Sequence, residues 1–110
     1  MTVYVDDAAI LAKVGRIDAR WYHLTADSRE ELHEFAEKLG LKRSWFQPGN
    51  KFGMAKPGSF SAESWHYDVT ERLRARAIRL GAEAVTSECM NEVIMDRSPA
   101  TRARKETRYA

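Results

Sequence analysis

Cysteine and long apolar runs are the scarcest features of this 110-residue sequence. The single cysteine, Cys89, cannot form an internal disulfide, and it excludes a metal site built on two cysteines. Such cysteine usage suits a reducing compartment. No apolar segment approaches the roughly 20 residues needed to cross a bilayer, and the N-terminal residues carry neither the basic region nor the apolar run of a signal peptide. We therefore expect a cytoplasmic protein that does not contact a membrane.

Several catalytic signatures are also absent from the sequence. It contains no glycine-rich phosphate loop of either common type, no HExxH and no GxSxG motif. Cys89 has no evident histidine partner, which argues against a thiol nucleophile. Any active site must therefore be assembled from side chains that are dispersed along the chain.

The composition is that of one globular domain. Hydrophobic residues make up 44% and charged residues 31% of the chain. The net charge of +2 is too small to indicate nucleic acid binding by itself. We expect residues 1–95 to form the domain and residues 96–110 to form a flexible tail that mainly aids solubility. The basic residues of this tail are Arg97, Arg102, Arg104, Lys105 and Arg108.

Two helices have clear boundaries. Ser28, followed three residues later by Glu31, forms a capping box, and Gly40 supplies a left-handed turn after the apolar helical repeat. Before the second helix, Asp68 or Thr70 provides the cap. The predicted helices are residues 28–39, a second one that runs from its cap to about Leu80, and a weaker one from Ser87 through Ile94.

Runs of β-branched and aromatic residues predict short strands. The predicted strands are residues 3–5, 21–25, 42–47, 65–67 and 83–86. Residues 8–20 are ambiguous between a helical turn and an irregular crossing. Because strand, helix and strand follow one another twice, we expect parallel strands joined by right-handed crossovers. The expected fold is a small single-domain α/β or α+β sandwich with four to five short strands, partly parallel, and two main helices.

Polar residues follow most of the predicted strands. In open α/β sheets, ligands bind beyond the carboxyl ends of the strands, so parallel strands would gather these polar groups at one edge. The segment Pro48 to Ser64 is a long loop without helical or strand periodicity, and we interpret it as a lid. The polar residues at or near the strand ends are Asp6, Asp7, Thr25, Asp27, Gln47, Lys51 and Asp68.

His66 and Asp68 are the strongest candidates for a site. Two residues apart on a strand, they point to the same face, and an imidazole oriented by a carboxylate is a general-base arrangement. Joined by Asp6, Asp7 or Asp27, the same pair offers mixed nitrogen and oxygen ligands to a divalent metal. For Asp68, a helix cap is the alternative interpretation.

The remaining candidates are weaker. His23 lies on a predicted strand, where packing competes with a catalytic role. His33 lies beside the apolar stripe of the first helix and is interpreted as structural. Arg72, in the first turn of the second helix, is placed to neutralise an anionic substrate. The further substrate-binding candidates are Gln47, Lys51 and Trp45.

Five blocks, in this order, carry a family resemblance. They are VYVDD at 3–7, WYHLTAD at 21–27, ELHEFA at 31–36, WFQ at 45–47 and HYDVT at 66–70. Together they resemble the bacterial and phage proteins catalogued as domain of unknown function four thousand and thirty-one. The resemblance spans roughly residues 3 to 86, and the segment after Ile94 lies outside it. It implies that the blocks belong together as a set, but it implies no established activity, substrate or cofactor.

The leading hypothesis is a hydrolase-like enzyme that acts on a phosphorylated or nucleotide-like small molecule with the help of a divalent metal. His66 would serve as base or ligand and Asp68 would orient it, while Asp6, Asp7 and Asp27 would complete an acidic cluster. One alternative is a non-catalytic module that binds a small anionic or nucleotide ligand at the same edge. A second alternative is a nucleic-acid-associated accessory protein that uses the basic tail.

Overall fold

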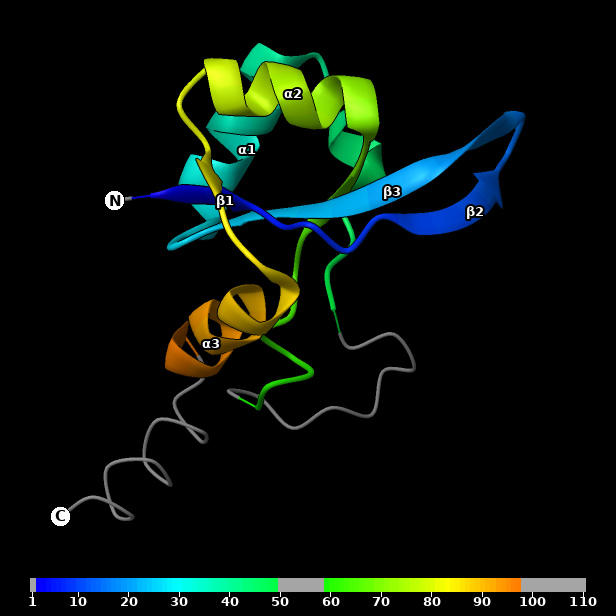
Figure 1. Cartoon of the computed structure of the whole chain (residues 1–110). Coiled ribbons are helices and arrows are strands. Elements are labelled where there is room, and N and C mark those ends of the chain that lie inside the picture. Colours follow the sequence, from blue (N-terminus) through cyan, green and yellow to red (C-terminus); the bar gives the residue numbers. More distant parts are fainter. Residues whose placement is uncertain (1, 50–58, 98–110) are drawn as a thin grey trace, which may run out of the picture.

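The strand β3 (Ile17–Ala26) is the one on which the sheet is built. It pairs antiparallel with β1 (Val3–Val5), β2 (Ile10–Val14) and β4 (Tyr67–Thr70). β5 (Glu83–Ala84) pairs with β1 in the parallel sense. This computed structural model describes residues 2–49 and 59–97, which form a small α/β domain with a mixed five-stranded sheet and three α-helices (Figure 1). The expected fold class is confirmed.

β1 and β2 follow one another along the same edge of β3. Leu24 pairs with both Val5 of β1 and Tyr67 of β4, so these two strands lie on opposite edges of β3. Trp21 likewise pairs with both β2 and β4. The shared edge is interrupted at residues 6–9, which lie between β1 and β2. The ambiguous residues 8–20 therefore include a β-hairpin, with Gly15 at φ 61 in its turn.

The first of the two predicted strand–helix–strand units, residues 21–47, is not found, because residues 42–47 form no strand and β4 is the next strand after the helix. α1 (Arg29–Leu39) lies between β3 and β4 in the chain, yet these strands are antiparallel. The long connection from Leu39 to Tyr67 allows the chain to return to either end of the sheet. The parallel pair is instead β1 and β5, which are far apart in sequence. The carboxyl ends of the strands are therefore divided between two ends of the sheet.

The prediction of a strand over residues 42–47 is also wrong. Residues Arg43–Trp45 form a short 3-10 helix, and only Gln47 pairs with another chain segment, through a bridge to His66. Aromatic residues favour strands because they fit a half-buried pleated surface. Trp45 is 48% exposed and lies in the 3-10 helix rather than in the sheet. β4 itself begins two residues later than the predicted strand.

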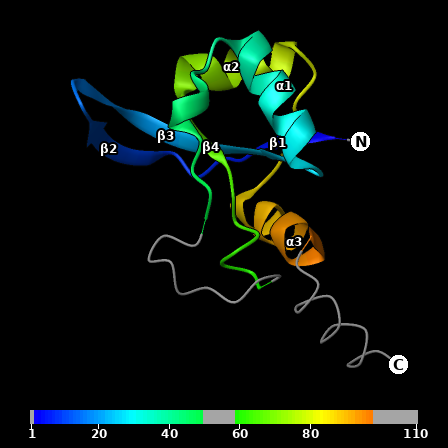
Figure 2. The same ribbon diagram turned by 180° about the vertical axis from the view of Figure 1, so that it is seen from behind.

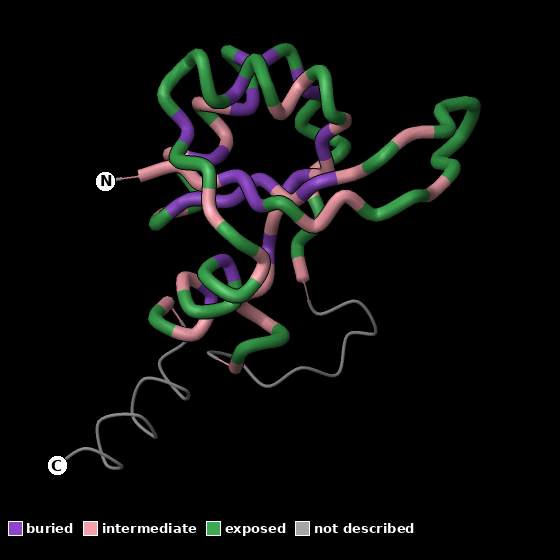
Figure 3. Tube along the Cα trace, in the orientation of Figure 1, coloured by how far each residue is buried: buried purple, intermediate pink, exposed green. Residues whose placement is uncertain are grey.

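The helices α1 and α2 (Glu71–Arg79) cover one face of the sheet (Figures 1 and 2). α1 begins at the predicted cap, where the Glu31 amide donates to Ser28 Oγ at 3.3 Å. Gly40 ends it at φ 92. In α2 the cap is Thr70, whose Oγ1 accepts the Leu73 amide at 3.4 Å. Between these helices and the sheet lies the core, in which Leu24, Leu32, Leu39, Tyr67 and Val69 are at most 1% exposed (Figure 3).

The helix α3 (Ser87–Arg97) lies against the other face of the sheet (Figures 1 and 2). It runs two residues beyond the predicted end of the domain. The Arg97 guanidinium donates to Thr25 Oγ1 and to the Ala26 carbonyl, both at 2.7 Å, and lies 3.6 Å from the Trp65 ring centroid. Arg97 therefore belongs to the domain rather than to the tail, and residues 98–110 lie outside the described residues. Within residues 2–49 and 59–97, no helix has the length and apolar character to span a membrane.

Candidate metal centre

The two faces of the sheet carry different chemistry because successive strand residues alternate sides. Leu24 and Val69 point into the core beneath α1 and α2, so their neighbours point to the face that α3 covers. On this second face, His23 of β3 is paired directly with Asp68 of β4. His66, two residues before Asp68, extends the same row.

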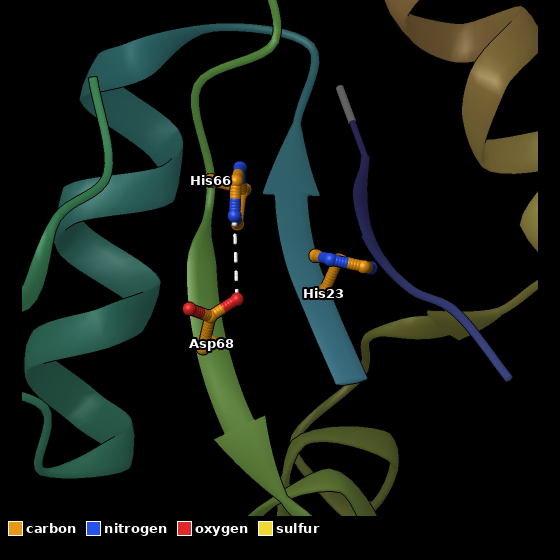
Figure 4. A group of neighbouring side chains, drawn as sticks. All are labelled: His23, His66 and Asp68. Atoms are coloured by element: carbon orange, nitrogen blue, oxygen red, sulfur yellow. Dashed lines mark ion pairs between the residues drawn. The ribbon is translucent and has the colours of Figure 1, made fainter. Parts of the chain in front are cut away.

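His23, His66 and Asp68 form a compact cluster on this face (Figure 4). One potential ligand atom from each residue lies within 4.8 Å of the other two. His66 Nε2 is 3.3 Å from Asp68 Oδ1. The two imidazole rings meet edge to face, with centroids 4.9 Å apart and an interplanar angle of 81°. All three side chains are partly buried, so the cluster is sheltered yet reachable. The structure thus brings the three predicted catalytic residues together.

The orientation of His23 is set by Asp6. The ring Nδ1 lies 2.6 Å from Asp6 Oδ2, while Asp6 Oδ1 accepts the His23 backbone N–H at 2.8 Å. Asp6 is only 2% exposed, and its Oδ1 also accepts the Ala8 amide at 3.3 Å. A carboxylate that accepts from Nδ1–H leaves the lone pair on Nε2. Nε2 is therefore the ring nitrogen that is free to bind a metal.

The His66 ring is held in the same tautomer by a different acceptor. Its Nδ1 lies 2.8 Å from the Ser64 carbonyl oxygen, which accepts a hydrogen bond but cannot donate one. Nε2 of His66 is consequently the unprotonated nitrogen when the ring is neutral, and it is this atom that faces Asp68. Both histidines therefore carry the second hydrogen bond that usually accompanies a metal-binding imidazole.

The charges of Asp6 and His23 stabilise each other. Burial by itself raises the pKa of Asp6, but hydrogen bonds from the His23 ring and backbone outweigh it and leave the pKa below its usual value. The hydrogen bond to Asp6 raises the pKa of His23, against the opposing effect of burial. Asp6 therefore stays ionised at neutral pH, and a cation that binds His23 must compete with a proton.

A cavity of about 240 Å³ lies between this face of the sheet and α3. β3 contributes His23 and Thr25, the position after β1 contributes Asp6, and the segment before β4 contributes Ser64 and His66. α3 contributes Ser87, Met90, Asn91 and Ile94. The cavity leaves room beside the two imidazoles for a bound water or a small substrate group.

Two of the other predicted acidic ligands, Asp7 and Asp27, have partners elsewhere. Asp7 accepts hydrogen bonds from the backbone amide and hydroxyl of Ser87, at the start of α3. Asp27, beyond the end of β3, accepts from the Thr2 amide and from the Tyr4 hydroxyl. Among the described residues, the three-residue cluster with potential metal ligands includes neither of them, nor Asp6.

The predicted substrate-binding residues fall in different places. Arg72 is exposed on α2, and α2 lies on the opposite face of the sheet from His23 and His66. Trp45 and Gln47 line a second, larger cavity that also includes Asp68. Lys51 and most of the predicted lid lie outside the described residues. His33 is also on the far side, with Nδ1 2.9 Å from the Tyr67 hydroxyl.

Two contributors to the site were not anticipated from the sequence. Ser64 acts through its backbone carbonyl, which any residue type provides, so no side-chain pattern could reveal it. α3 was predicted only weakly and without a role. Met90, Ile94 and Arg97 recur at helical spacing, and all three pack toward the sheet or its connections. That spacing is the sequence signal that could have placed α3 on this face.

The fold and the cluster together define a small α/β domain with a candidate centre of two histidines and one aspartate. A family model described as "Protein of unknown function (DUF4031)" matches residues 3–97. The chain belongs to this family, as the five sequence blocks indicated, and the match extends past Ile94 to the end of α3. No curated protein and no solved structure matched the chain.

Proposed function

We propose that this protein is a metal-dependent hydrolase that acts on a phosphorylated small molecule. The observation that carries the proposal is that both histidine rings, His23 and His66, are oriented by a hydrogen bond at Nδ1. Each ring has its Nδ1 beside an oxygen acceptor, Asp6 for His23 and the Ser64 carbonyl for His66. Structural histidines need no such matched arrangement, whereas a metal site depends on it.

The ligand set favours a transition metal over Mg²⁺. Imidazole nitrogens suit Zn²⁺, Fe²⁺ and Ni²⁺, while Mg²⁺ prefers a shell of oxygen atoms. Two histidines and one carboxylate are also the protein ligands of many catalytic zinc sites, in which water occupies the open position. We therefore infer that His23, His66 and Asp68 hold Zn²⁺ or a similar ion, and that the cavity under α3 receives the water.

The chemistry that follows is hydrolysis of a phosphate ester. A metal lowers the pKa of its bound water and supplies hydroxide at neutral pH. With a metal held by His23, His66 and Asp68, this hydroxide would form the bond to phosphorus as the bond from phosphorus to the ester oxygen breaks. The leaving oxygen would take the proton that the water released, so the products would be an alcohol and inorganic phosphate. In this scheme His66 is a ligand rather than a base, because its free nitrogen binds the metal.

Metal binding can be tested by isothermal titration calorimetry of the metal-free full-length protein with Zn²⁺, Mn²⁺ and Mg²⁺. Wild type should bind Zn²⁺ most tightly, and His66→Ala should lose most of that affinity. His33→Gln is a matched control because His33 lies on the other face of the sheet and is expected to leave Zn²⁺ binding unchanged. If wild type binds none of the three ions, the metal-dependent hydrolase is rejected.

Turnover separates the hydrolase from a non-catalytic module for a small anionic ligand. Zn²⁺-loaded wild type and His66→Ala can be incubated with a panel of phosphate monoesters and assayed for released phosphate. The hydrolase requires release that wild type supports and His66→Ala does not. Saturable ester binding without release by wild type would favour the binding module instead. Equal release by both proteins would indicate a contaminating phosphatase and contradict the assignment of this cluster.

A further inference from the structure

The second cavity lies beside β4 and reaches the β2–β3 hairpin, which extends past the end of β4. Its volume is about 570 Å³, which is within the range of small-molecule sites. The hairpin contributes Arg16 and Trp21, and the segment between α1 and β4 contributes Trp45 and Gln47. Asp68, a member of the metal cluster, is also in its wall.

This cavity is joined to the metal cluster by rigid structure. Gln47 and His66 exchange two backbone hydrogen bonds, at 2.8 Å and 3.0 Å. The wall that carries Gln47 is therefore fixed to a candidate metal ligand through the backbone. Asp68, whose Oδ1 lies 3.3 Å from His66 Nε2, is the member of the cluster that also lines the cavity. A molecule that fills the cavity would extend from the metal toward the hairpin.

The side chains of this cavity suit a flat aromatic ring. Trp45 is 48% exposed, so much of its indole is open to a stacking partner. The Trp21 indole nitrogen already donates to the Ala12 carbonyl at 2.9 Å, so Trp21 offers the cavity an apolar surface. Gln47 is exposed and carries both a donor and an acceptor, the combination that pairs with the edge of a nucleobase.

The charged side chains around the cavity favour an anionic ligand as a whole, with the cations near the end that would hold the base. Arg16 is in the cavity wall, and the Lys42 ammonium lies 5.6 Å from the centre of the Trp45 ring. Asp68 is the acidic residue among those that line the cavity, and a metal bound at the cluster would neutralise its charge. The stacking surface and the amide would contact the base of a nucleotide, and a metal at the other end would contact its phosphate.

We propose that the cavity between the hairpin and Trp45 binds the base of a nucleoside monophosphate, with the phosphate directed to the metal cluster. This inference rests on the proposed function, because it names the substrate class of the same metal centre. The base stacks on Trp45 and meets the Gln47 amide with its edge. The nucleotide-like substrate is therefore preferred over a phosphorylated molecule without an aromatic ring.

The cavity can be tested apart from the metal. Metal-free wild type in EDTA is titrated with adenosine, guanosine, cytidine and uridine, and binding is followed by quenching of tryptophan fluorescence and by calorimetry. At least one nucleoside should bind wild type and His66→Ala with similar affinity. Trp45→Ala and Gln47→Ala should each weaken this binding, roughly tenfold for the loss of one stacking ring. If no nucleoside binds, or if Trp45→Ala binds as wild type does, the base site is rejected.

The second arm uses the Zn²⁺-loaded protein and compares the four nucleoside 5′-monophosphates with inorganic phosphate. Wild type should bind at least one nucleotide more tightly than inorganic phosphate, and Trp45→Ala should lose this preference while its Zn²⁺ affinity stays unchanged. Leu80→Ala is a matched control, because Leu80 is equally exposed, at 48%, but lies at the end of α2. Equal affinities of wild type for nucleotides and inorganic phosphate would overturn the base site. Failure of the proposed function looks different: nucleosides bind normally, but no metal is taken up or no phosphate is released.

Discussion

The Asp6 carboxylate contacts His23 at two points, the backbone N–H and the imidazole ring. Asp6 Oδ1 accepts the His23 backbone N–H at 2.8 Å, and Oδ2 lies 2.6 Å from ring Nδ1. The first contact takes the place of a strand carbonyl at the point where β1 ends and β2 has not begun. The second contact fixes the tautomer of the ring. One side chain thus joins the break in the sheet to the orientation of a candidate metal ligand.

Asp6→Asn is predicted to lower Zn²⁺ affinity about 10- to 100-fold, as loss of a ligand's supporting carboxylate commonly does. The asparagine oxygen can still accept the backbone N–H of His23. Its NH₂ group, however, donates to Nδ1 and favours the tautomer with the proton on Nε2, which cannot bind a metal. Calorimetric titration of the metal-free variant with Zn²⁺ gives the affinity.

Asp7→Asn is the matched control for this prediction, because it makes the same change one residue away. Asp7 is exposed and contacts Ser87 rather than a histidine. Its substitution is expected to affect the start of α3 slightly and to leave Zn²⁺ affinity unchanged. If both variants bind Zn²⁺ as tightly as wild type, Asp6 stabilises the backbone of the sheet but does not support metal binding by His23.

Features that depend on neighbouring residues could be predicted from the sequence. The limits of α1 follow from the Ser28 cap and from Gly40, and both signals act within one helical turn. The shared face of His66 and Asp68 follows from the two-residue strand period. The pairing direction of β3 and β4 could not be predicted, because it depends on the path of a long connection rather than on either strand.

The roles of Asp6 and Arg97 depended on tertiary register, which no local pattern contains. Asp6 reaches His23 only because β1 pairs with the end of β3 and the chain then breaks away. Arg97 was assigned to the tail because basic residues follow it closely in the sequence. Its contacts are with Thr25 and the 63–65 segment, which are distant in the chain. Charge in a sequence does not distinguish a solvated arginine from a partly buried one that is bonded to the sheet.

Gly49→Ala is predicted to destabilise the fold and to weaken Zn²⁺ binding. Gly49 has φ 72, and a Cβ there would lie 2.7 Å from the Ser61 carbonyl oxygen. The turn that carries Ser61 must then move, and this turn ends at Ser64, the partner of His66. We expect a loss of about 2 to 4 kcal/mol from backbone strain and overpacking together. Urea unfolding and Zn²⁺ titration measure the two effects.

Gly40→Ala separates strain from steric conflict in this comparison. Gly40 also has a positive φ, 92, but nothing lies within 4 Å of its Cβ position. It should lose about 1 to 2 kcal/mol, the cost of the left-handed conformation alone, with Zn²⁺ affinity unchanged. Equal effects of the two substitutions on both measurements would show that the turn yields freely and does not support His66.

Arg97→Met is predicted to lower the free energy of unfolding by about 2 kcal/mol, because it leaves buried oxygen atoms without their charged donor. These are Thr25 Oγ1 and the Ala26 carbonyl. Burial lowers the pKa of Arg97 to about 10, so the guanidinium remains charged at neutral pH. Arg76→Met, an exposed position on α2, should change stability by less than about 0.5 kcal/mol. Urea unfolding of both variants decides whether Arg97 secures α3 to the sheet.

His33 makes stability depend on pH, with a predictable sign. Burial, and then the charges of Arg43 and Arg29, lower the pKa of His33 from its ordinary value. In the window below the unfolded-state pKa of about 6.5, the unfolded chain therefore binds more protons than the folded one. The contribution of His33 to stability is complete above this window and is lost as the pH falls through the folded pKa.

His33→Gln removes this titration and keeps a hydrogen-bonding group near Tyr67. The free energy of unfolding, measured with urea between pH 8 and pH 5, should fall more steeply for wild type than for the variant. Because all other titrations are common to both proteins, their difference isolates His33. The free energy of unfolding of the variant, relative to that of wild type, should thus be higher at pH 5 than at pH 8. Parallel curves, or a steeper fall for the variant, would mean that protonation of His33 is no costlier in the fold than in the unfolded chain.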